Sequence, residues 1–359
     1  MLAFFDDQQL EHEPGFFLSS GSRRPNPEVA ERATVLKEIL IQHGHELKTP
    51  KYLGMEPVAT IHTPAYLHFL ENIYQRWQQI EGASEEVIAN VHPNRYSSAY
   101  PDSAVGQAGW HMADTACPVG PKTWASALAS ANTAVEAAQN VLDGTGSVYA
   151  LCRPPGHHAF ADMAGGFCYL NNSALAAQRL RQGYKRIAIL DVDVHHGNGT
   201  QGIFYHRDDV FTVSLHADPV RFYPFFWGHR HERGESAGAG FNLNCPLERG
   251  TSDENYLQTL EDALSRIDSF CPEAMVVALG LDAFQGDPLA GLSITTEGFQ
   301  KIGRAIAALK LPTVLVQEGG YLCRELGENL IAFIDGFEKS LFHQALTHSR
   351  SSMRETSTI

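Results

Sequence analysis

Five short runs of the chain consist almost wholly of apolar residues. They are rich in Val, Ile and Leu and do not alternate with polar residues, which is typical of parallel strands buried on both faces. Between most of them, apolar residues recur at helical spacing. The expected strands are 148–152, 186–191, 210–215, 274–280 and 312–317, and the expected helices are 122–142, 171–182, 253–270, 295–309 and 324–341.

This alternation predicts an α/β fold in which helices cover both faces of a predominantly parallel, multi-stranded sheet. The chain shows no linker, charge block or internal repeat, so residues 1–346 are expected to form a single domain. Residues 16–27 have the Ser, Gly and Pro content of a loop, and residues 347–359 are expected to be a polar tail. Ser252 and Thr295 are suited to cap the helices that follow them.

Each expected strand runs into a loop that is dense in polar residues or glycine. In open parallel sheets, ligands bind outside the carboxyl ends of the strands, so we expect these loops to meet in one site. The loops are Arg-Pro-Pro-Gly-His-His at 153–158, Asp-Val-Asp-Val-His-His-Gly-Asn-Gly at 191–199, Ser-Leu-His-Ala-Asp-Pro at 214–219, Gly-Leu-Asp-Ala-Phe-Gln-Gly-Asp-Pro at 280–288 and Glu-Gly-Gly-Tyr at 318–321.

Two of these loops contain the residues of a candidate metal site. Asp193 and His195 are two residues apart, which places both side chains on one side of extended backbone. Asp282 follows another strand end. Three protein ligands leave one coordination position open, the pattern of a catalytic rather than a structural zinc site. Because the donor atoms are oxygen and nitrogen, iron, cobalt and manganese remain open as alternatives.

Candidate proton-transfer groups lie in the other loops. His157 and His158 are on a Pro-Pro-Gly turn, which is stiff enough to hold imidazoles in place. A histidine can take a proton from water and deliver one to a departing amine. Asp191 could accept the other ring N–H of His157. Tyr321 follows two glycines, which allow its phenol to lie over a pocket and donate to a developing oxyanion.

A group of aromatic residues falls in loops that contain glycine or proline. Such side chains can form the walls of a narrow channel for a thin aliphatic chain. The alternative is that they fill a second apolar cluster under the loops. The residues are Phe167, Phe222, Tyr223, Phe225, Phe226 and Trp227.

Composition narrows the class of protein. The chain of 359 residues has a net charge of −14, and no apolar run approaches the length of a membrane span. The acidic charge argues against a nucleic-acid binder and suits a cationic partner. The six cysteines form no Cys-x-x-Cys pair, which predicts buried free thiols rather than disulfides or a cysteine-based zinc site. Because no basic secretory segment opens the sequence, we expect a cytoplasmic protein.

Four motifs resemble the histone deacetylase superfamily, whose members have the arginase–deacetylase fold. The resemblance spans about residues 59–337, and the stretches 120–124 and 162–166 are similar to bacterial acetylpolyamine amidohydrolases. The motifs are Arg-Pro-Pro-Gly-His-His at 153–158, Gly-Gly-Phe-Cys-Tyr-Leu-Asn-Asn at 165–172, Leu-Asp-Val-Asp-Val-His-His-Gly-Asn-Gly-Thr at 190–200 and Glu-Gly-Gly-Tyr at 318–321.

The resemblance implies one zinc ion, held by Asp193, His195 and Asp282. It implies that His157 and His158 are the tandem catalytic histidines, with His158 as general base and later general acid. Further implied site residues are Tyr321 as donor to the scissile carbonyl, Asp191 behind the histidines, Phe167 and Tyr223 beside the substrate channel, and Gly166 and Gly319 in substrate binding.

The resemblance also implies bound monovalent cations, potassium or sodium, with a structural role. The first cation would lie near Asp191, Asp193, His195, Ser214 and Leu215, and the second near Phe204, Arg207 and Val210. Composition and spacing alone do not indicate either site.

Two positions depart from patterns within the family. Asn198 stands where some members have an aspartate behind the second histidine, so His158 should be less basic here. Val105 stands where a polyamine-selective member would carry a carboxylate for a distal ammonium group. The acidic residues nearby in sequence are Asp102, Asp114, Glu11 and Glu13.

Together these features predict a zinc-dependent amidohydrolase that removes acetyl or another short acyl group from a small cationic amine, with acetylpolyamines as the expected substrates. Nucleic-acid and membrane partners are not expected. An acyl-lysine protein deacylase, an arginase-like dinuclear manganese hydrolase using Asp282 and Asp287, and a non-catalytic module that binds acylated ligands remain as alternatives. Relatives with a long early loop often form dimers over the active-site rim, which leaves a homodimer open.

Overall fold

A parallel sheet of eight strands forms the centre of the molecule. The computed structural model describes residues 1–97 and 99–355, with side chains up to residue 340. The strand order is β4-β1-β5-β10-β9-β6-β7-β8, and every neighbouring pair is parallel. The strands are β1 (Leu2–Phe4), β4 (Glu46–Lys48), β5 (Ser147–Ala150), β6 (Ile187–Asp191), β7 (Val210–Ala217), β8 (Asn242–Leu247), β9 (Ala274–Leu279) and β10 (Thr313–Gln317).

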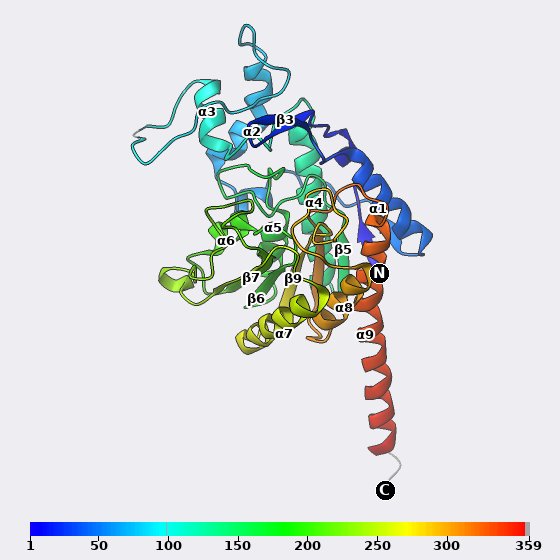
Figure 1. The fold of residues 1–359 in the computed structure, drawn as a ribbon. Helices are drawn as coiled ribbons and strands as arrows, with labels where there is room; N and C mark the ends of the chain where they lie inside the picture. Colours follow the sequence, from blue (N-terminus) through cyan, green and yellow to red (C-terminus); the bar gives the residue numbers. More distant parts are fainter. Residues whose placement is uncertain (98, 356–359) are drawn as a thin grey trace.

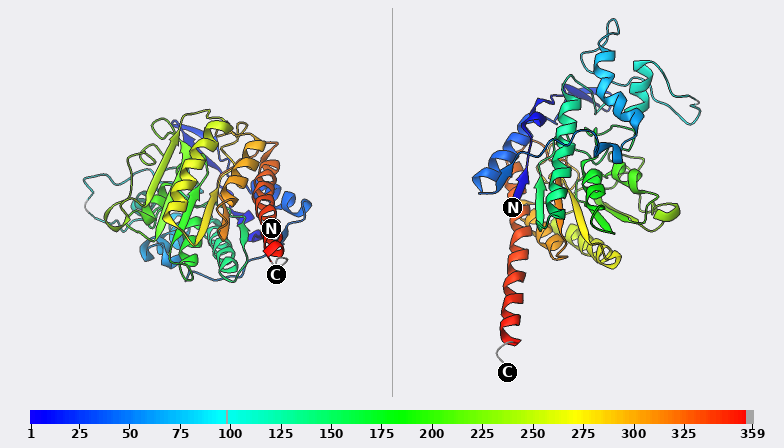
Figure 2. Two further views of the ribbon diagram at one scale, coloured as in Figure 1. Left: turned by 90° about the horizontal axis from the view of Figure 1, so that it is seen from below. Right: turned by 180° about the vertical axis from the view of Figure 1, so that it is seen from behind.

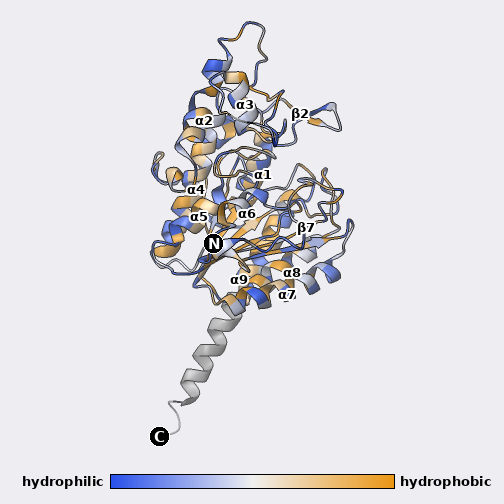
Figure 3. Ribbon diagram, turned by 90° about the vertical axis from the view of Figure 1, so that its left-hand side faces the viewer, coloured by the Kyte–Doolittle hydropathy of each residue, from blue (hydrophilic) through white to orange (hydrophobic). Residues whose placement is uncertain are grey.

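Helices cover both faces of this sheet, as Figures 1 and 2 show. Strand β6 illustrates why its sequence does not alternate: Ala188 and Leu190 pack toward one helical layer, and Ile187 and Ile189 pack toward the other. Figure 3 shows apolar residues concentrated along the strands. The first layer is α1 (Ala30–Gln42), α7 (Asp253–Phe270), α8 (Thr296–Ala307) and α9 (Leu326–Glu355); the second is α4 (Thr123–Leu142), α5 (Asn172–Leu180) and α6 (Asn198–Phe204).

A smaller apolar cluster lies under the loops at one end of the molecule. It joins α2 (Pro64–Trp77), α3 (Ala104–His111) and part of α4. Figure 1 shows α2 and α3 at the top of the molecule, beyond the large sheet. No helix among the described residues is long and apolar enough to cross a bilayer. The 3₁₀ helices are η1 (Asp7–Glu11), η2 (Val58–Thr60) and η3 (Ser236–Gly238).

The five expected strands are confirmed, but the expectation of a loop at residues 16–27 is wrong. An antiparallel hairpin, β2 (Phe16–Ser19) and β3 (Ser22–Pro25), occupies most of this stretch. Ser20 and Gly21 both have positive φ, of 50° and 76°, which is the backbone of a tight two-residue hairpin turn. The Ser-Gly pair read as loop content is therefore the turn of a hairpin.

The ends of the expected helices differ in how they are capped. Thr295 caps α8 as expected, because its hydroxyl accepts from the N–H of Gly298 at 3.0 Å. Ser252 makes no such bond at the start of α7, so the expectation of a side-chain cap there is wrong. Helix α9 continues through 347–355 of the expected tail, and 356–359 lie outside the described residues. A domain boundary at residue 346 stays a prediction.

We predict that Gly336→Ala destabilises the protein. Helices α8 and α9 approach closely at two glycines: a Cβ on Gly336 would lie 2.0 Å from the carbonyl oxygen of Gln300, and one on Gly303 would lie 2.2 Å from that of Phe333. Overpacking of this kind should lower the free energy of unfolding by about 1–3 kcal/mol. Urea unfolding measures the change. Gly146→Ala is the control, since nothing lies within 4 Å of its added Cβ; equal stability of the two variants would contradict the prediction.

Candidate active site

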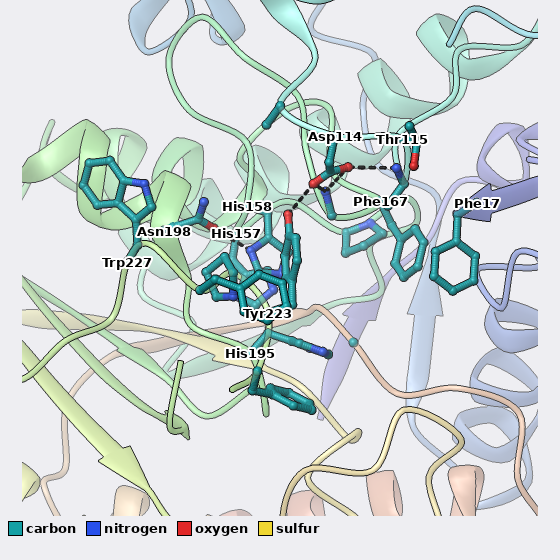
Figure 4. Close-up of a pocket in the computed structure, with 18 of the residues that line it drawn as sticks. Phe17, Asp114, Thr115, His157, His158, Phe167, His195, Asn198, Tyr223 and Trp227 are labelled. Carbon is teal, nitrogen blue, oxygen red and sulfur yellow. Dashed lines mark hydrogen bonds between the residues drawn. The ribbon is translucent and has the colours of Figure 1, made fainter. Parts of the chain in front are cut away.

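The loops after β5, β6, β7, β9 and β10 meet around one cavity of about 690 Å³, as the positions of these loops in the sequence predicted. The cavity is lined by aromatic and other apolar side chains together with histidines, acids and small polar residues from several loops. Figure 4 shows Trp227 and Phe17 on opposite sides of Tyr223, with His157, His158 and His195 close to it. All six aromatic residues that the sequence indicated line this cavity.

The structure brings Asp193, His195 and Asp282 together beside this cavity, with their ligand atoms within 4.8 Å of one another. Nδ1 of His195 lies 3.1 Å from Oδ1 of Asp193 and 3.2 Å from Oδ2 of Asp282. Asp282 Oδ2 is buried and accepts no hydrogen bond. Burial and the charge of Asp193 raise the pKa of Asp282. Two buried carboxylates and an imidazole, with one carboxylate oxygen that accepts no hydrogen bond, are a suitable ligand set for a divalent cation.

Backbone amides hold these ligands in place. Oδ1 of Asp193 accepts from the N–H of His195 at 2.8 Å, and its Oδ2 accepts from the N–H of Gly319 at 2.8 Å. Oδ1 of Asp282 accepts from the N–H of Val194 at 3.0 Å. The loops after β6, β9 and β10 are thus joined through the same carboxylates that form the candidate metal site.

The tandem histidines lie side by side, with ring centroids 4.0 Å apart. Nδ1 of His157 lies 2.9 Å from Oδ2 of Asp191, the partner expected from the sequence, and Nδ1 of His158 lies 2.6 Å from Oδ1 of Asn198. The carboxylate of Glu318 fixes the turn that bears them. It accepts from the backbone N–H of Gly156 at 2.6 Å and of His157 at 3.0 Å.

The surroundings of the two histidines shift their pKa values in opposite directions. Burial alone would lower the pKa of His157, but the charges of Asp193 and Asp191 outweigh burial and raise this pKa well above its ordinary value. Burial lowers the pKa of His158 well below its ordinary value, and the charges of His157 and His195 lower it further. These opposite shifts favour a protonated His157 beside a neutral His158.

Tyr321 lines the cavity from the loop after β10 and is buried. Burial raises the pKa of its phenol well above the ordinary value, so the hydroxyl stays protonated. The guanidinium of Arg32 lies 4.7 Å from the ring centroid and donates to the carbonyl oxygens of Gly320 and Glu318 at 2.5 and 2.9 Å. The edge of Phe167 lies against the ring, at 5.9 Å between centroids.

Aromatic rings, with the acids Asp114 and Asp162, form the walls beside these groups. Phe222 stacks on His195 at 5.0 Å, and Tyr223 meets His158 edge-on at 4.9 Å. The hydroxyl of Tyr223 donates to Oδ2 of Asp114 at 2.6 Å, and Asp114 also accepts from the N–H of Gly166 at 3.2 Å. Among the described residues that line the cavity, none is Lys or Arg.

Sequence reasoning gave too little weight to several residues of this site. Asp114 was one of four nearby acids, and of these it alone lines the cavity among the described residues. Phe17 reaches Phe167 at 5.6 Å from the hairpin that was expected to be a loop. Arg32 lies on α1, a helix the sequence did not indicate. Of these residues, only Phe17 could have been suspected from its neighbours, because two adjacent phenylalanines at 16 and 17 are unusual in an exposed loop.

The expected cation groups are brought together in part. Ser214 on β7 pairs in register with Asp191 on β6, and its hydroxyl lies 2.8 Å from Nδ1 of His216. The N–H of Arg207 donates to the carbonyl oxygen of Phe204 at 3.0 Å. Cation binding at either group stays a prediction.

The cysteines are free, as expected, although Cys271 is exposed and Cys323 is partly so. The structure also brings Cys168 close to His157 and Glu318, a clustering that the sequence did not indicate. The Sγ atom of Cys168 donates to the carbonyl oxygen of Gly166 at 3.4 Å, and both oxygens of Glu318 accept hydrogen bonds.

The fold and the site define a class of protein. Residues 26–337 match the histone deacetylase domain, and the chain belongs to that family. It is an enzyme of the amide-hydrolysing class, with the arginase–deacetylase fold that the motifs implied.

Among its relatives are two bacterial acetylpolyamine amidohydrolases. One, from Burkholderia pseudomallei, is 44% identical over 341 residues, covering 94% of this chain and 98% of the relative. Acetylpolyamine amidohydrolase 1 of Pseudomonas aeruginosa is 40% identical over 343 residues, covering 94% and 99%. The crystal structure of the Burkholderia pseudomallei acetylpolyamine aminohydrolase superposes with a TM-score of 0.92 at 43% identity, covering 95% of this chain and 99% of that one.

We predict that Asn198→Asp raises the pKa of His158. A carboxylate in place of the amide that lies 2.6 Å from Nδ1 would stabilise the imidazolium by about the effect of one close opposite charge, raising the pKa by about 1–3. Position 198 opens α6, where an acidic residue is favourable, so the fold should tolerate the change. Histidine NMR titration measures the result. His68, which is exposed and lies outside the cavity lining, serves as the internal reference, and an unmoved His158 would contradict the prediction.

Proposed function

We propose that this protein is a zinc-dependent amidohydrolase that removes acetyl groups from acetylated polyamines. The observation that carries the proposal is the oxygen of Asp282 that accepts no hydrogen bond, held with Asp193 and His195 beside the cavity that the tandem histidines line. The names of the relatives support the choice of substrate. Zinc, when bound by these three residues, would polarise the amide carbonyl and stabilise the negative charge that develops there.

His158 is assigned the role of general base and then general acid. The Oδ1 atom of Asn198 is an acceptor, so Nδ1 of His158 carries the proton and Nε2 is free to take one from the attacking water. Nε2 then returns this proton to the departing amine nitrogen. The charges of Asp193 and Asp191 raise the pKa of His157, so this ring would add positive charge beside the reacting centre. A base must be neutral to act, so Asn198→Asp would move the acidic limb of the pH–rate profile to higher pH.

Tyr321 is assigned as the hydrogen-bond donor to the developing oxyanion. Its phenol stays protonated because burial raises its pKa, which suits a donor. Phe167 and Tyr223 would flank the acyl-amine chain, with Gly166 and Gly319 beside it. Together these groups would position the amide while the apolar walls exclude water from the linear part of the substrate.

Asp114 supports a cationic substrate. It is an acid in the wall of a cavity whose described lining contains no Lys or Arg, so a distal ammonium group would find an anionic partner there. Val105, which stands where a carboxylate for the ammonium group was expected, packs in the cluster of α2 and α3 instead. The acid is supplied from a different position in the sequence.

Two alternatives differ in substrate or in chemistry. A protein deacylase would use the same cavity for an acetyl-lysine side chain, and a binding module would retain acylated ligands without turnover. The arginase-like alternative needs carboxylates for a second metal, yet both oxygens of Asp287 accept backbone N–H groups. Monovalent cations near Asp191 and Phe204, a homodimer and a cytoplasmic location stay predictions from the sequence.

We predict that the zinc-loaded protein turns over N-acetylputrescine and N-acetylcadaverine at least about tenfold more efficiently than an acetyl-lysine peptide, a difference of about 1.4 kcal/mol in activation free energy. A chelator should abolish turnover, zinc should restore it, and elemental analysis should find one zinc per chain. Preference for the peptide would establish the protein deacylase instead. Silence on both substrates with zinc bound would favour another acyl group or the binding module.

We predict that Asp114→Asn lowers kcat/KM for N-acetylputrescine by about 10- to 100-fold, the effect of losing one charged hydrogen bond. N-acetylbutylamine, which has no ammonium group, separates loss of charge from damage to the wall, and its turnover should change little. Asp102→Asn is the matched control, because Asp102 is exposed and lies outside the cavity lining. Equal losses on both substrates would show that Asp114 only supports the wall through Tyr223.

A further inference from the structure

Asp287 joins two loops of the active site through one buried carboxylate. It follows β9 in the same loop as Asp282. Its Oδ1 accepts from the N–H of Leu289 at 2.8 Å, and its Oδ2 accepts from the N–H of Tyr321 at 2.8 Å. Leu289 and Tyr321 both line the cavity. The carboxylate therefore ties the backbone of the residue that bears the phenol to the facing wall.

Other groups hold the rest of the turn at 318–321, so the hydrogen bond from Tyr321 to Asp287 has a separate role. Arg32 binds the carbonyl oxygens of Glu318 and Gly320 and lies over the phenol ring. Gly319 donates its N–H to Asp193. These contacts fix the residues before Tyr321 and the face of its ring. The backbone N–H of Tyr321 itself is directed at Asp287.

We propose that Asp287 is a positioning residue that sets the placement of the Tyr321 hydroxyl in the cavity that Asp193 and His195 also line. The proposal rests on the function assigned to Tyr321 above. The hydroxyl is at the far end of a long side chain, so a small rotation of the backbone is enlarged at the oxygen. A displacement of about 1 Å in a catalytic group can cost about 100-fold in rate.

A carboxylate, and not an amide, is what this position requires. Both oxygens of Asp287 face N–H donors, and an asparagine offers one acceptor and one donor group. In Asp287→Asn, the amide NH₂ would therefore face the N–H of either Leu289 or Tyr321, and one buried donor would lose its partner. The isosteric change tests the bonds without opening a cavity.

The test is a double-mutant cycle on N-acetylputrescine with the zinc-loaded protein, comparing Asp287→Asn, Tyr321→Phe and the double variant. Asp287→Asn should lower kcat by about 10- to 100-fold while KM changes by less than about threefold. In the Tyr321→Phe background, the same change should alter kcat by less than about threefold, because the hydroxyl it positions is gone.

Asp253→Asn is the matched control. Asp253 also uses both oxygens to hold another segment, accepting from the N–H of Thr295 at 2.9 Å and from its hydroxyl at 2.6 Å, away from the cavity. It should lower the melting temperature and leave kcat unchanged in both backgrounds. If Asp287→Asn does not fold, Asp287→Glu, which keeps both acceptors but displaces them by one methylene, takes its place in the cycle.

Equal fold-losses from Asp287→Asn in the two backgrounds, or a lower melting temperature with unchanged kcat as for Asp253→Asn, would overturn the positioning role. Full activity in Tyr321→Phe would instead overturn the function assigned to Tyr321, whatever Asp287→Asn does.

Discussion

Three buried carboxylates at the ends of two neighbouring strands determine how the centre of this molecule is arranged. Asp191 and Asp193 end β6 or follow it, and Asp282 follows β9, the strand paired with β6. Like charges buried together are costly unless each is matched. Backbone N–H groups and His157 match all of their oxygens except Oδ2 of Asp282. This oxygen lies 3.2 Å from Nδ1 of His195, and the two ligand atoms together form a place for a cation.

Nearby charges also give the two adjacent imidazoles, His157 and His158, different tendencies to hold a proton. A carboxylate lies behind His157 and an amide behind His158, and each residue comes from the loop or strand end next to the ligands. A second protonated ring beside the first would be repelled by it. The site can therefore hold a proton on one ring while it keeps the other ready to receive one. The neutral state of His158 depends on residue 198 being an asparagine, because its amide carries no charge whereas an aspartate there would stabilise the imidazolium.

Much of this site could be predicted from the sequence because its residues follow buried strands, whose carboxyl ends meet by topology. The strand runs were unmistakable, and the order of polar residues after them placed Asp193, His195 and Tyr321 together. Strands β1 and β4 have three residues each, too few for a pattern, and β8 mixes polar residues with a proline at the sheet edge. The contacts that support Tyr321 were missed for a different reason. Arg32 donates to the carbonyl oxygen of Gly320, which is 288 positions later in the chain, and no local sequence pattern encodes such a contact.

The strand order has a consequence for how the chain assembles. Strand β10 lies between β5 and β9, so it alone connects the half of the sheet built from β4, β1 and β5 to the half built from β9, β6, β7 and β8. It is also the last of these eight strands along the chain, so it is the last of them to leave the ribosome. Until it emerges, the two halves present unpaired edges to each other and to other chains, a state in which proteins of this size are prone to aggregate. The turn that bears Tyr321 follows β10 directly, so the step that unites the sheet is also the step that completes the pocket.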